Sequence, residues 1–350
     1  MENSLQLPVI DLSSSDRMAT AQSIRQACVD CGFFYLVGHG IEEDLFKRVF
    51  EESKKFFMLP LEDKLKLFRT NHRGYTPLYA ESLDPSSSSR GDSKEGFYVG
   101  PLNDKKTGED LNQWPPAGVL PHWRSTVEQY YRSVLKVGVK LTSLVALALN
   151  LDEDFFEKIG ALDQCNGFLR LLHYPGEVES SDRQIYGASA HSDYGMITLL
   201  AAEDISGLQV CREKFAQPLV WEDVHNLRGA FIVNIGDMME RWTNCLFRST
   251  LHRVMPTGRD RYSMALFLDP NPNCLVECLK SCCSESNPPS LILLTIPRMN
   301  PAPDNLSSQS SGVHHSSDLN VASVVGCGFV TVVDYVPSKD NILTIIRLSF

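Results

Sequence analysis

The sequence lacks any excess of positive charge. Its 350 residues contain 33 Lys and Arg against 43 Asp and Glu, which gives a formal net charge of −10. Nucleic acids and anionic membrane surfaces attract basic patches, so we expect neither to be a partner. The chain also lacks an apolar run of the roughly 20 residues that a membrane-spanning helix needs. The best candidate, residues 134–151, contains Lys136 and Lys140 and is typical of an amphipathic helix.

A secretory signal is missing too, because the N-terminal residues contain no basic segment followed by an apolar one. We therefore expect a cytoplasmic protein whose ten cysteines are reduced thiols rather than a disulfide framework. Cys28 and Cys31 have C-x-x-C spacing, but no second pair lies near them. A denser group follows later in the chain: Cys274, Cys278, Cys282 and Cys283. Thiols are the expected state of this group, and a structural zinc site is the alternative.

Common catalytic motifs are absent as well. No G-x-G-x-x-G or Walker segment is present, which argues against nucleotide binding. No G-x-S-x-G elbow exposes a serine, which argues against a Ser-His-Asp hydrolase. The chemistry must therefore be sought in other side chains.

Hydrophobic periodicity divides the chain into two parts. Apolar residues recur at helical spacing over 16–31, 42–57, 119–150 and, in a shorter segment, 152–160. After about residue 165 the chain consists of short β-type segments separated by turns, which favours an antiparallel sandwich or barrel. We therefore expect an α+β fold, with a mostly helical N-terminal domain over 1–150 and a β-rich domain over 151–289.

The segment ASAHSDYGMITLL, residues 188–200, carries the first candidate site. Residues two apart on a strand share a face, so His191 and Asp193 can converge on one point. His252, in the later segment STLHRVMP, supplies a third group. Two histidines and one carboxylate form the facial triad that holds non-haem Fe(II) and leaves positions open for O₂ and substrate. The alternative is a turn-capping Asp beside a surface His, with His252 as a satisfied strand histidine.

A second candidate site lies on the next strand, RYSMALFL, where Arg261 and Ser263 share one face. A guanidinium fork beside a hydroxyl forms a two-point site for a carboxylate. A buried Arg within a strand is costly without an anion. The pattern therefore predicts a bound carboxylate, with an internal salt bridge to Asp or Glu as the alternative.

Taken in order along the chain, these motifs resemble the plant-type 2-oxoglutarate- and Fe(II)-dependent dioxygenase family (isopenicillin N synthase-like). The matching segments lie between about residues 7 and 289: LPVIDL, CGFFYLVGHGI, FFMLPLEDK, HSDYGMITLL, ISGLQV, FIVNIGDMMERWTN, STLHRV and RYSMALFL. The resemblance implies a double-stranded β-helix (jelly-roll) core, with flanking helices that come mainly from the N-terminal half.

The resemblance also implies a site and a reaction. His191, Asp193 and His252 would bind Fe(II), and Arg261 and Ser263 would bind the distal carboxylate of 2-oxoglutarate. The implied reaction is the hydroxylation or desaturation of a small organic molecule with O₂, which releases succinate and CO₂ and is supported by ascorbate. Two alternatives stay open: a fold-retaining, catalytically impaired isoform with a regulatory role or none, and an Fe(II) oxidase independent of 2-oxoglutarate. Neither the substrate nor the oligomeric state follows from the sequence.

Further residues are assigned by the same reasoning. The family's Asn-x-Tyr-Pro segment is LLHYP here, so Tyr174 is kept as a cosubstrate ligand while Leu172 stands where Asn is common. His173 should face away from Tyr174 and pack, and His39 should belong to a structural turn. Four aromatic residues are candidates for the substrate pocket, with core packing as the alternative: Phe97, Tyr98, Tyr194 and Phe267.

The last part of the chain departs from the family. Residues 290–350 are apolar, then Ser-rich, then β-prone, where the family usually has a polar C-terminal helix. We expect a divergent tail that is poorly ordered or loosely packed. Its segments SLILLTI and FVTVVDYV would be prone to aggregation if left unpaired.

Overall fold

A computed structural model describes residues 5–84, 91–102, 110–163, 166–177, 185–289, 294–295, 323–326 and 329–332. By its internal contacts the chain divides into two compact units, Met1–Ile296 and Pro297–Phe350. In the second unit the described residues form one antiparallel hairpin, β15 (Ser323–Gly326) with β16 (Phe329–Val332). The description below concerns the first unit.

The helices of this unit are α1 (Arg17–Asp30), α2 (Glu43–Phe57), α3 (Leu61–Leu65), α4 (Trp123–Ala148), α5 (Phe155–Lys158) and α6 (Asp237–Trp242), with a short 3-10 turn, η1 (Lys280–Cys282). The strands are β1 (Val9–Asp11), β2 (Phe33–Val37), β3 (Gly74–Thr76), β4 (Glu95–Val99), β5 (Asn166–Tyr174), β6 (Ala188–His191), β7 (Ile197–Ala202), β8 (Leu208–Cys211), β9 (Glu222–Asp223), β10 (Phe231–Ile235), β11 (Leu251–Val254), β12 (Arg261–Asp269), β13 (Leu275–Val276) and β14 (Leu294–Thr295).

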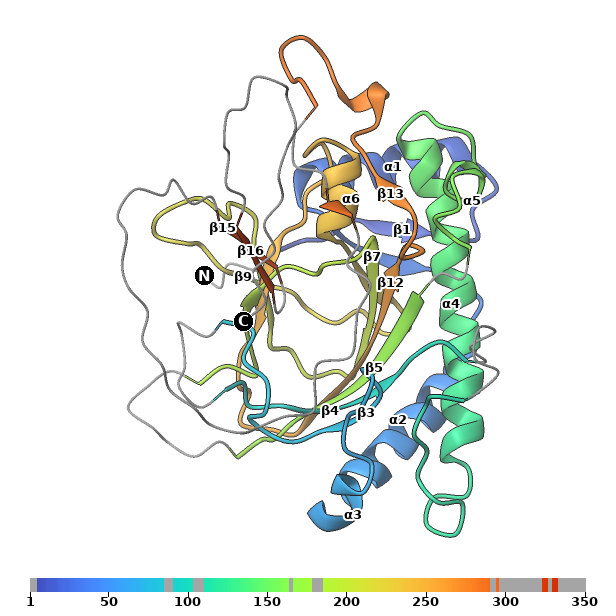
Figure 1. The fold of residues 1–350 in the computed structure, drawn as a ribbon, viewed down its shortest axis with the longest axis vertical. Coiled ribbons are helices and arrows are strands. Elements are labelled where there is room, and N and C mark those ends of the chain that lie inside the picture. The colour runs from blue at the N-terminus through green and yellow to red at the C-terminus, as the bar shows by residue number, and fades with distance from the viewer. Residues whose placement is uncertain are drawn as a thin grey trace. The chain divides into compact units, whose positions relative to one another are not determined.

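Two sheets form the β-rich core. The larger has the order β1-β2-β10-β7-β12-β5-β4-β3, and the smaller has the order β6-β11-β8-β9. From β5 to β12 the pairing is nested: β5 pairs with β12, β6 with β11, β7 with β10 and β8 with β9. This nesting is the connectivity of a jelly roll, and it confirms the core expected from the resemblance. Figure 1 shows the long strands of the large sheet beside the helices.

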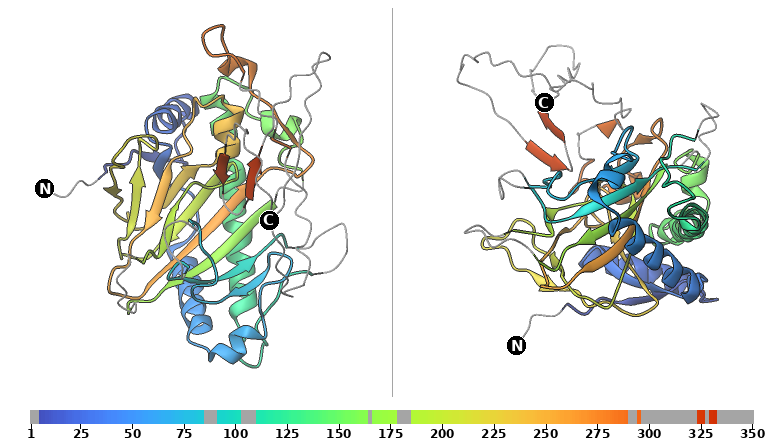
Figure 2. Two further views of the ribbon diagram at one scale, coloured as in Figure 1. Left: turned by 60° about the vertical axis from the view of Figure 1, so that its left-hand side comes forward. Right: turned by 90° about the horizontal axis from the view of Figure 1, so that it is seen from below.

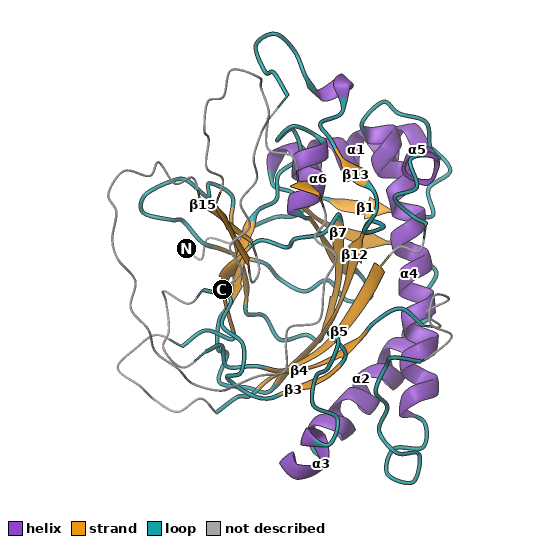
Figure 3. Cartoon of the chain, in the orientation of Figure 1, coloured by secondary structure: helices purple, strands orange, loops and turns teal. Residues whose placement is uncertain are grey.

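The two faces of the large sheet bury different side chains. On β12, Tyr262, Met264, Leu266 and Leu268 belong to one apolar cluster, which also contains the buried residues of α1, α2 and α4. The alternate residues of that strand, including Arg261 and Ser263, point the opposite way. Leu172 and Tyr174 of β5 belong to a second cluster, together with Val210 of β8 and Val254 of β11. Helices therefore cover one face, as Figure 3 shows, and the jelly-roll interior lies on the other.

The predicted helices are present, with ends that local sequence explains. The Asp16 carboxylate accepts a hydrogen bond from the Ala19 N–H and caps α1, as expected for an Asp at this position. Pro121 stands just before α4, which begins at Trp123, four residues later than the predicted start at 119. None of the described helices is both long enough and apolar enough to cross a membrane.

The boundary expected at residue 150 does not separate two sheets. Strands β1 to β4 precede it, yet they share the large sheet with β5, β7, β10 and β12, as the two views in Figure 2 allow the reader to follow. The N-terminal part therefore completes the sheet on which the later strands are built. The division into 1–150, 151–289 and 290–350 stays a prediction, and the expectation of a poorly ordered tail falls mostly outside the described residues.

Candidate active site

The jelly-roll interior brings three potential metal ligands together. His191 ends β6, and its partner in register on β11 is His252. Asp193 follows two residues after His191, and its Oδ1 lies 3.8 Å from His191 Nε2 and 3.6 Å from His252 Nε2. The ligand atoms of the three residues all lie within 4.8 Å of one another. Among the described residues, no other group of His, Cys, Asp or Glu has this arrangement.

Both imidazoles are held in the orientation that a metal requires. His191 Nδ1 lies 2.7 Å from the Ser189 carbonyl oxygen, and His252 Nδ1 lies 3.1 Å from the Thr250 carbonyl oxygen. Because a carbonyl can only accept a hydrogen bond, each Nδ1 carries the proton and each Nε2 keeps its lone pair. The two rings stand 4.2 Å apart between centroids, with both Nε2 atoms directed at the Asp193 carboxylate.

Two neighbouring strands hold the Asp193 carboxylate in place. Its Oδ2 accepts hydrogen bonds from Thr198 Oγ1 of β7 at 2.6 Å and from Asn234 Nδ2 of β10 at 2.8 Å. These bonds leave Oδ1 to face the histidines. Neither Thr198 nor Asn234 was predicted, although a lone polar residue in an apolar strand is a signal that could have identified both.

The electrostatics agree with this arrangement. Burial alone would raise the pKa of Asp193, but the imidazoles of His252 and His191 and the Thr198 hydrogen bond hold that pKa well below its usual range. Burial lowers the pKa of His191 to about 3. Burial also acts to lower the pKa of His252, but the adjacent Asp193 carboxylate outweighs it and raises that pKa. The cluster therefore combines an ionised carboxylate with a neutral His191, as divalent metal binding needs.

The second candidate site is a pair of buried donors on β12. Arg261 and Ser263 are each only 1% exposed. Arg261 Nε donates to the Ile205 carbonyl oxygen at 3.3 Å, whereas Arg261 Nη1 and Ser263 Oγ have no hydrogen-bond partner among the described residues. No carboxylate of the described part of the chain forms an ion pair with Arg261, so the internal salt bridge considered above is absent there.

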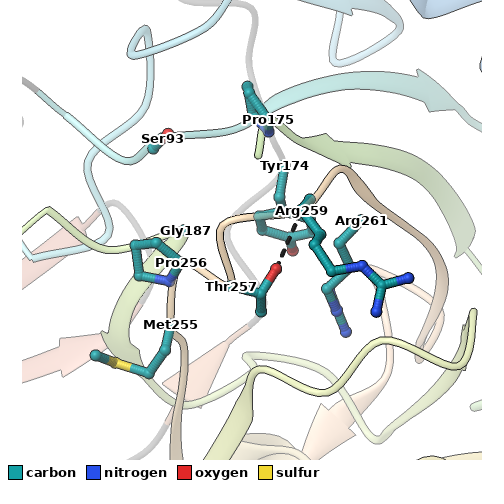
Figure 4. A pocket seen from close by; sticks show the side chains of 9 residues that line it. All are labelled: Ser93, Tyr174, Pro175, Gly187, Met255, Pro256, Thr257, Arg259 and Arg261. Carbon is teal, nitrogen blue, oxygen red and sulfur yellow. Dashed lines mark hydrogen bonds between the residues drawn. The ribbon is translucent and has the colours of Figure 1, made fainter. Parts of the chain in front are cut away.

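The surroundings of Arg261 form a small pocket. The Tyr174 ring lies 4.9 Å from the guanidinium carbon of Arg261, and Figure 4 shows both side chains among the residues that line this pocket. Leu172 is paired with Ser263 on the adjacent strand and brings no polar group to the site. Buried donors without acceptors are costly in a folded protein unless a ligand satisfies them. Their chemistry, a guanidinium fork and a hydroxyl, fits a carboxylate.

The four aromatic residues proposed for the pocket do not all face the interior. Phe97 is fully buried on the helix side, where its ring centroid lies 4.8 Å from that of Phe56 and 4.9 Å from that of Trp123. Its assignment to the pocket is therefore wrong, because Phe97 and Tyr98 alternate on β4 and only one of them can face inward. Phe267 shares the inner face of β12 with Arg261 and Ser263, and Tyr194 packs partly against the helix-side cluster.

Arg170 is a charged residue of the interior that the sequence reasoning missed. It lies on the inner face of β5, paired with Ala265 on one side and Tyr98 on the other. Its guanidinium carbon lies 4.3 Å from the Tyr98 ring centroid, and its Nη2 donates to Glu81 at 2.5 Å. Its Nε is buried and has no hydrogen-bond partner among the described residues.

His173 and His39 have structural roles. His173 faces the helices, stacks on Tyr262 at 4.5 Å between ring centroids and hydrogen-bonds to Glu95, as expected for a packing residue. The His39 ring lies 2.9 Å from the Gly229 carbonyl oxygen and accepts from the Ile41 N–H, which fits a structural turn. The cysteines within the described residues are free thiols, and none of them belongs to a metal-like group.

Comparison with known proteins gives the same assignment. Residues 7–117 match the family model described as non-haem dioxygenase in morphine synthesis N-terminal, and residues 165–270 match the 2OG-Fe(II) oxygenase superfamily. The chain is 40% identical to kihadalactone A synthase LFS of Citrus sinensis over 291 residues, which cover 81% of this chain and 86% of that enzyme.

Two solved structures extend the comparison to the fold. A full-length Neurospora crassa protein in complex with alpha-KG and thymine superposes with a TM-score of 0.72 at 30% identity, covering 82% of this chain and 93% of that one. JOX2 in complex with 2OG, Fe and JA superposes with a TM-score of 0.71 at 26% identity, covering 85% of this chain and 84% of that one. The chain thus belongs to the 2-oxoglutarate- and Fe(II)-dependent dioxygenase family, whose members oxidise small molecules with O₂.

Proposed function

We propose that His191, Asp193 and His252 hold the Fe(II) of this dioxygenase, and that Arg261 and Ser263 bind the distal carboxylate of 2-oxoglutarate. The observation that carries the proposal is the pairing of two features in one interior. Three ligand atoms lie within 4.8 Å of one another, and two buried donors without acceptors lie on the inner face of β12. These two donors, Arg261 Nη1 and Ser263 Oγ, also favour a 2-oxoglutarate-dependent enzyme over an oxidase that needs no cosubstrate.

Each group has a distinct role in this scheme. When bound, iron and 2-oxoglutarate would activate O₂, which would be the oxidant as 2-oxoglutarate is converted to succinate and CO₂. His191 Nε2, His252 Nε2 and Asp193 Oδ1 would hold the metal, as a set of three ligands of the kind that leaves positions open for O₂ and substrate. Arg261 and Ser263 fix the far end of the diacid, and the Tyr174 ring closes one side of the guanidinium. The apolar side chains between the two sheets exclude bulk water.

Substrate recognition is proposed for the region around Arg170. Tyr98 and Arg170 lie next to each other on adjacent strands, and Phe267 lies on the same sheet face. The free Nε of Arg170 favours a substrate that carries a hydrogen-bond-accepting oxygen, such as a carbonyl or carboxylate. The ligands named for the solved structures agree with organic substrates that carry oxygen acceptors: thymine is bound in the Neurospora crassa protein and JA in JOX2. The oxidation is a hydroxylation or a desaturation, with ascorbate as a supporting reductant.

The decisive experiment measures succinate formation. Purified full-length protein would be supplied with Fe(II), ascorbate and 2-oxoglutarate and challenged with pools of small molecules, with mass spectrometry detecting gain of oxygen or loss of hydrogen. We expect succinate and oxidised product in equal amounts with one pool, and slower, uncoupled succinate release without substrate. The absence of both succinate formation and Fe(II) binding would support the catalytically impaired isoform instead.

The alternative of a catalytically impaired isoform depends on whether the residues after about 290 are needed for the site. Every residue of the proposed site lies in the unit Met1–Ile296. We therefore expect limited proteolysis to remove the residues after about 290 and to leave a fragment that still binds Fe(II) and 2-oxoglutarate. A protease-resistant fragment that extends through Phe350 would contradict the expectation of a loosely packed tail.

We also propose a cytoplasmic location without nucleic acid or membrane partners. The formal net charge of −10 supports this, because it disfavours both kinds of anionic surface. Fractionation of cells that express the tagged chain would test it, and recovery with membranes or chromatin would contradict it.

A further inference from the structure

A buried ion pair lies directly behind His191. Asp92 and Lys94 come from the loop that leads into β4, and their side chains are 1% and 4% exposed. Lys94 Nζ lies 2.6 Å from Asp92 Oδ2, while the next carboxylate, that of Glu81, lies 3.9 Å from Lys94 Nζ. Burying two charges costs several kcal/mol, roughly, unless both are well satisfied. The location of the pair therefore calls for an explanation.

The second carboxylate oxygen of Asp92, Oδ1, binds Ser189, the residue that orients His191. Asp92 Oδ1 accepts hydrogen bonds from the Ser189 N–H at 3.1 Å and from the Ser189 hydroxyl at 2.6 Å. Two bonds from one residue to one carboxylate oxygen restrict the position of the Ser189 peptide. The carbonyl of Ser189 in turn accepts the proton of His191 Nδ1 at 2.7 Å. A continuous chain of hydrogen bonds thus runs from Asp92 through Ser189 to the imidazole.

The second histidine has a comparable support with different chemistry. Thr250, whose carbonyl accepts from His252, donates its hydroxyl proton to the Cys31 carbonyl at 2.5 Å. Gly32 lies so close to this turn that a Cβ there would stand 2.0 Å from the Arg248 carbonyl oxygen. Both histidines are therefore supported by residues that precede residue 100. The support of His252 is neutral, whereas that of His191 is charged and depends on Asp92.

We propose that Asp92 is a positioning residue that sets the orientation of His191 for metal binding. This inference rests on the proposed role of His191 as an iron ligand. Lys94 neutralises the Asp92 carboxylate, so that the support can be fully buried. Direct hydrogen-bond partners of metal-binding histidines change metal affinity by about 10–100-fold when they are removed, and Asp92 acts one step behind such a partner, the Ser189 carbonyl.

The test is a metal titration of the apo full-length protein, with Co(II) alone as a spectroscopic probe and Fe(II) alone under anaerobic conditions. We expect Asp92→Ala to weaken metal affinity by up to about 10-fold, the lower end of the effect of losing a direct partner, and to alter the Co(II) absorption spectrum, because His191 is no longer held in one orientation. Ser189→Ala keeps the backbone bond to Asp92 and should lose less. Asp92→Asn keeps an oxygen that accepts from Ser189 and should recover part of the lost affinity.

Glu95→Gln is the matched control. Glu95 is 8% exposed and pairs with Lys64 in a second buried ion pair, but it lies on the helix side of β4. This variant should lose stability without a change in Co(II) affinity or spectrum. The proposal is overturned if folded Asp92→Ala binds Co(II) as tightly as the wild type, or if Glu95→Gln weakens binding equally. If Asp92→Ala does not fold, wild-type affinity in both Ser189→Ala and Asp92→Asn overturns it. A wild-type protein that binds neither metal would instead contradict the assignment of the metal ligands.

Discussion

The metal cluster and the carboxylate pocket face the same interior, but their polar atoms are satisfied differently. Around Asp193 the atoms that support the ligands are satisfied: Thr198 and Asn234 donate to one carboxylate oxygen, and the histidine Nδ1 atoms donate to backbone carbonyls. Around Arg261, a guanidinium nitrogen and the Ser263 hydroxyl are buried without partners among the described residues. The supports of the metal ligands thus have their partners within the protein, whereas two donors of the second region have none among the described residues. Substitutions should therefore act in opposite ways on the ligand-free protein.

The largest effect is expected from Asp193→Asn. The amide keeps the shape of the side chain and an oxygen for Thr198, but it removes the charge that the metal needs. Fe(II) binding and succinate formation should both fall below detection, as measured by metal titration and by succinate assay. Turnover at the wild-type rate would exclude Asp193 as a ligand.

Arg261→Met should weaken ligand binding in the carboxylate pocket without destabilising the ligand-free protein. Affinity for 2-oxoglutarate should fall by about 2–5 kcal/mol, because one partner of a buried charge pair is removed. The ligand-free protein should keep its free energy of unfolding or gain some, since a buried cation without an ion-pair partner among the described residues is replaced by an apolar side chain. Calorimetry and denaturant unfolding would measure both quantities.

Arg259→Met is the control for this variant. Arg259 lines the same pocket in Figure 4 but is exposed, so its removal should change 2-oxoglutarate affinity little. A clear loss of stability in ligand-free Arg261→Met would mean that the bond to the Ile205 carbonyl and the contact with the Tyr174 ring outweigh the cost of burying the charge, and it would break the contrast between the two regions.

Thr198→Val tests the metal cluster, where the supporting polar atoms have hydrogen-bond partners. The substitution removes one donor to the buried Asp193 carboxylate, so it should lower the free energy of unfolding by about 1–3 kcal/mol. Metal affinity should fall with it, because a support of the ligand is lost. If Thr198→Val is as stable as the wild type and binds Fe(II) equally well, the metal cluster is less dependent on its supports than the structure indicates.

The smallest effect is expected from Ser263→Ala. The hydroxyl contributes about 1 kcal/mol to 2-oxoglutarate binding, because Arg261 continues to hold the same carboxylate. The ligand-free protein should not be destabilised, since the hydroxyl has no partner to lose among the described residues. A destabilised ligand-free variant would contradict this, as thermal unfolding with and without 2-oxoglutarate would reveal.

Spacing alone identified the residues whose relation is local, whereas His252 and Tyr174 were joined to them by the order of the family's motifs. Spacing of two along a strand places His191 near Asp193 and Arg261 near Ser263, and the order of the motifs predicts the jelly roll around them. Spacing does not tell which face of a strand is directed to the interior, because this depends on the register of the strand in the sheet. Phe97 and Tyr98 are neighbours on β4, yet Phe97 packs on Trp123 on the helix side and Tyr98 packs on Arg170 on the other side.

The supports of the site could not be predicted, because they join segments far apart in the chain. Asp92 meets Ser189 across 97 positions, and Thr250 meets Cys31 across 219. No local pattern carries such contacts. A lone polar residue in an apolar strand, such as Asn234 in FIVNIGD, marks a position to inspect but does not name its partner.

The most direct test of the central claim is a crystal structure of the full-length protein with Fe(II) and 2-oxoglutarate, prepared without oxygen. We expect one metal ion bound by His191 Nε2, Asp193 Oδ1 and His252 Nε2, and one carboxylate of 2-oxoglutarate hydrogen-bonded to Arg261 Nη1 and Ser263 Oγ. A metal ion bound elsewhere, or a diacid whose carboxylates both avoid Arg261, would contradict the account.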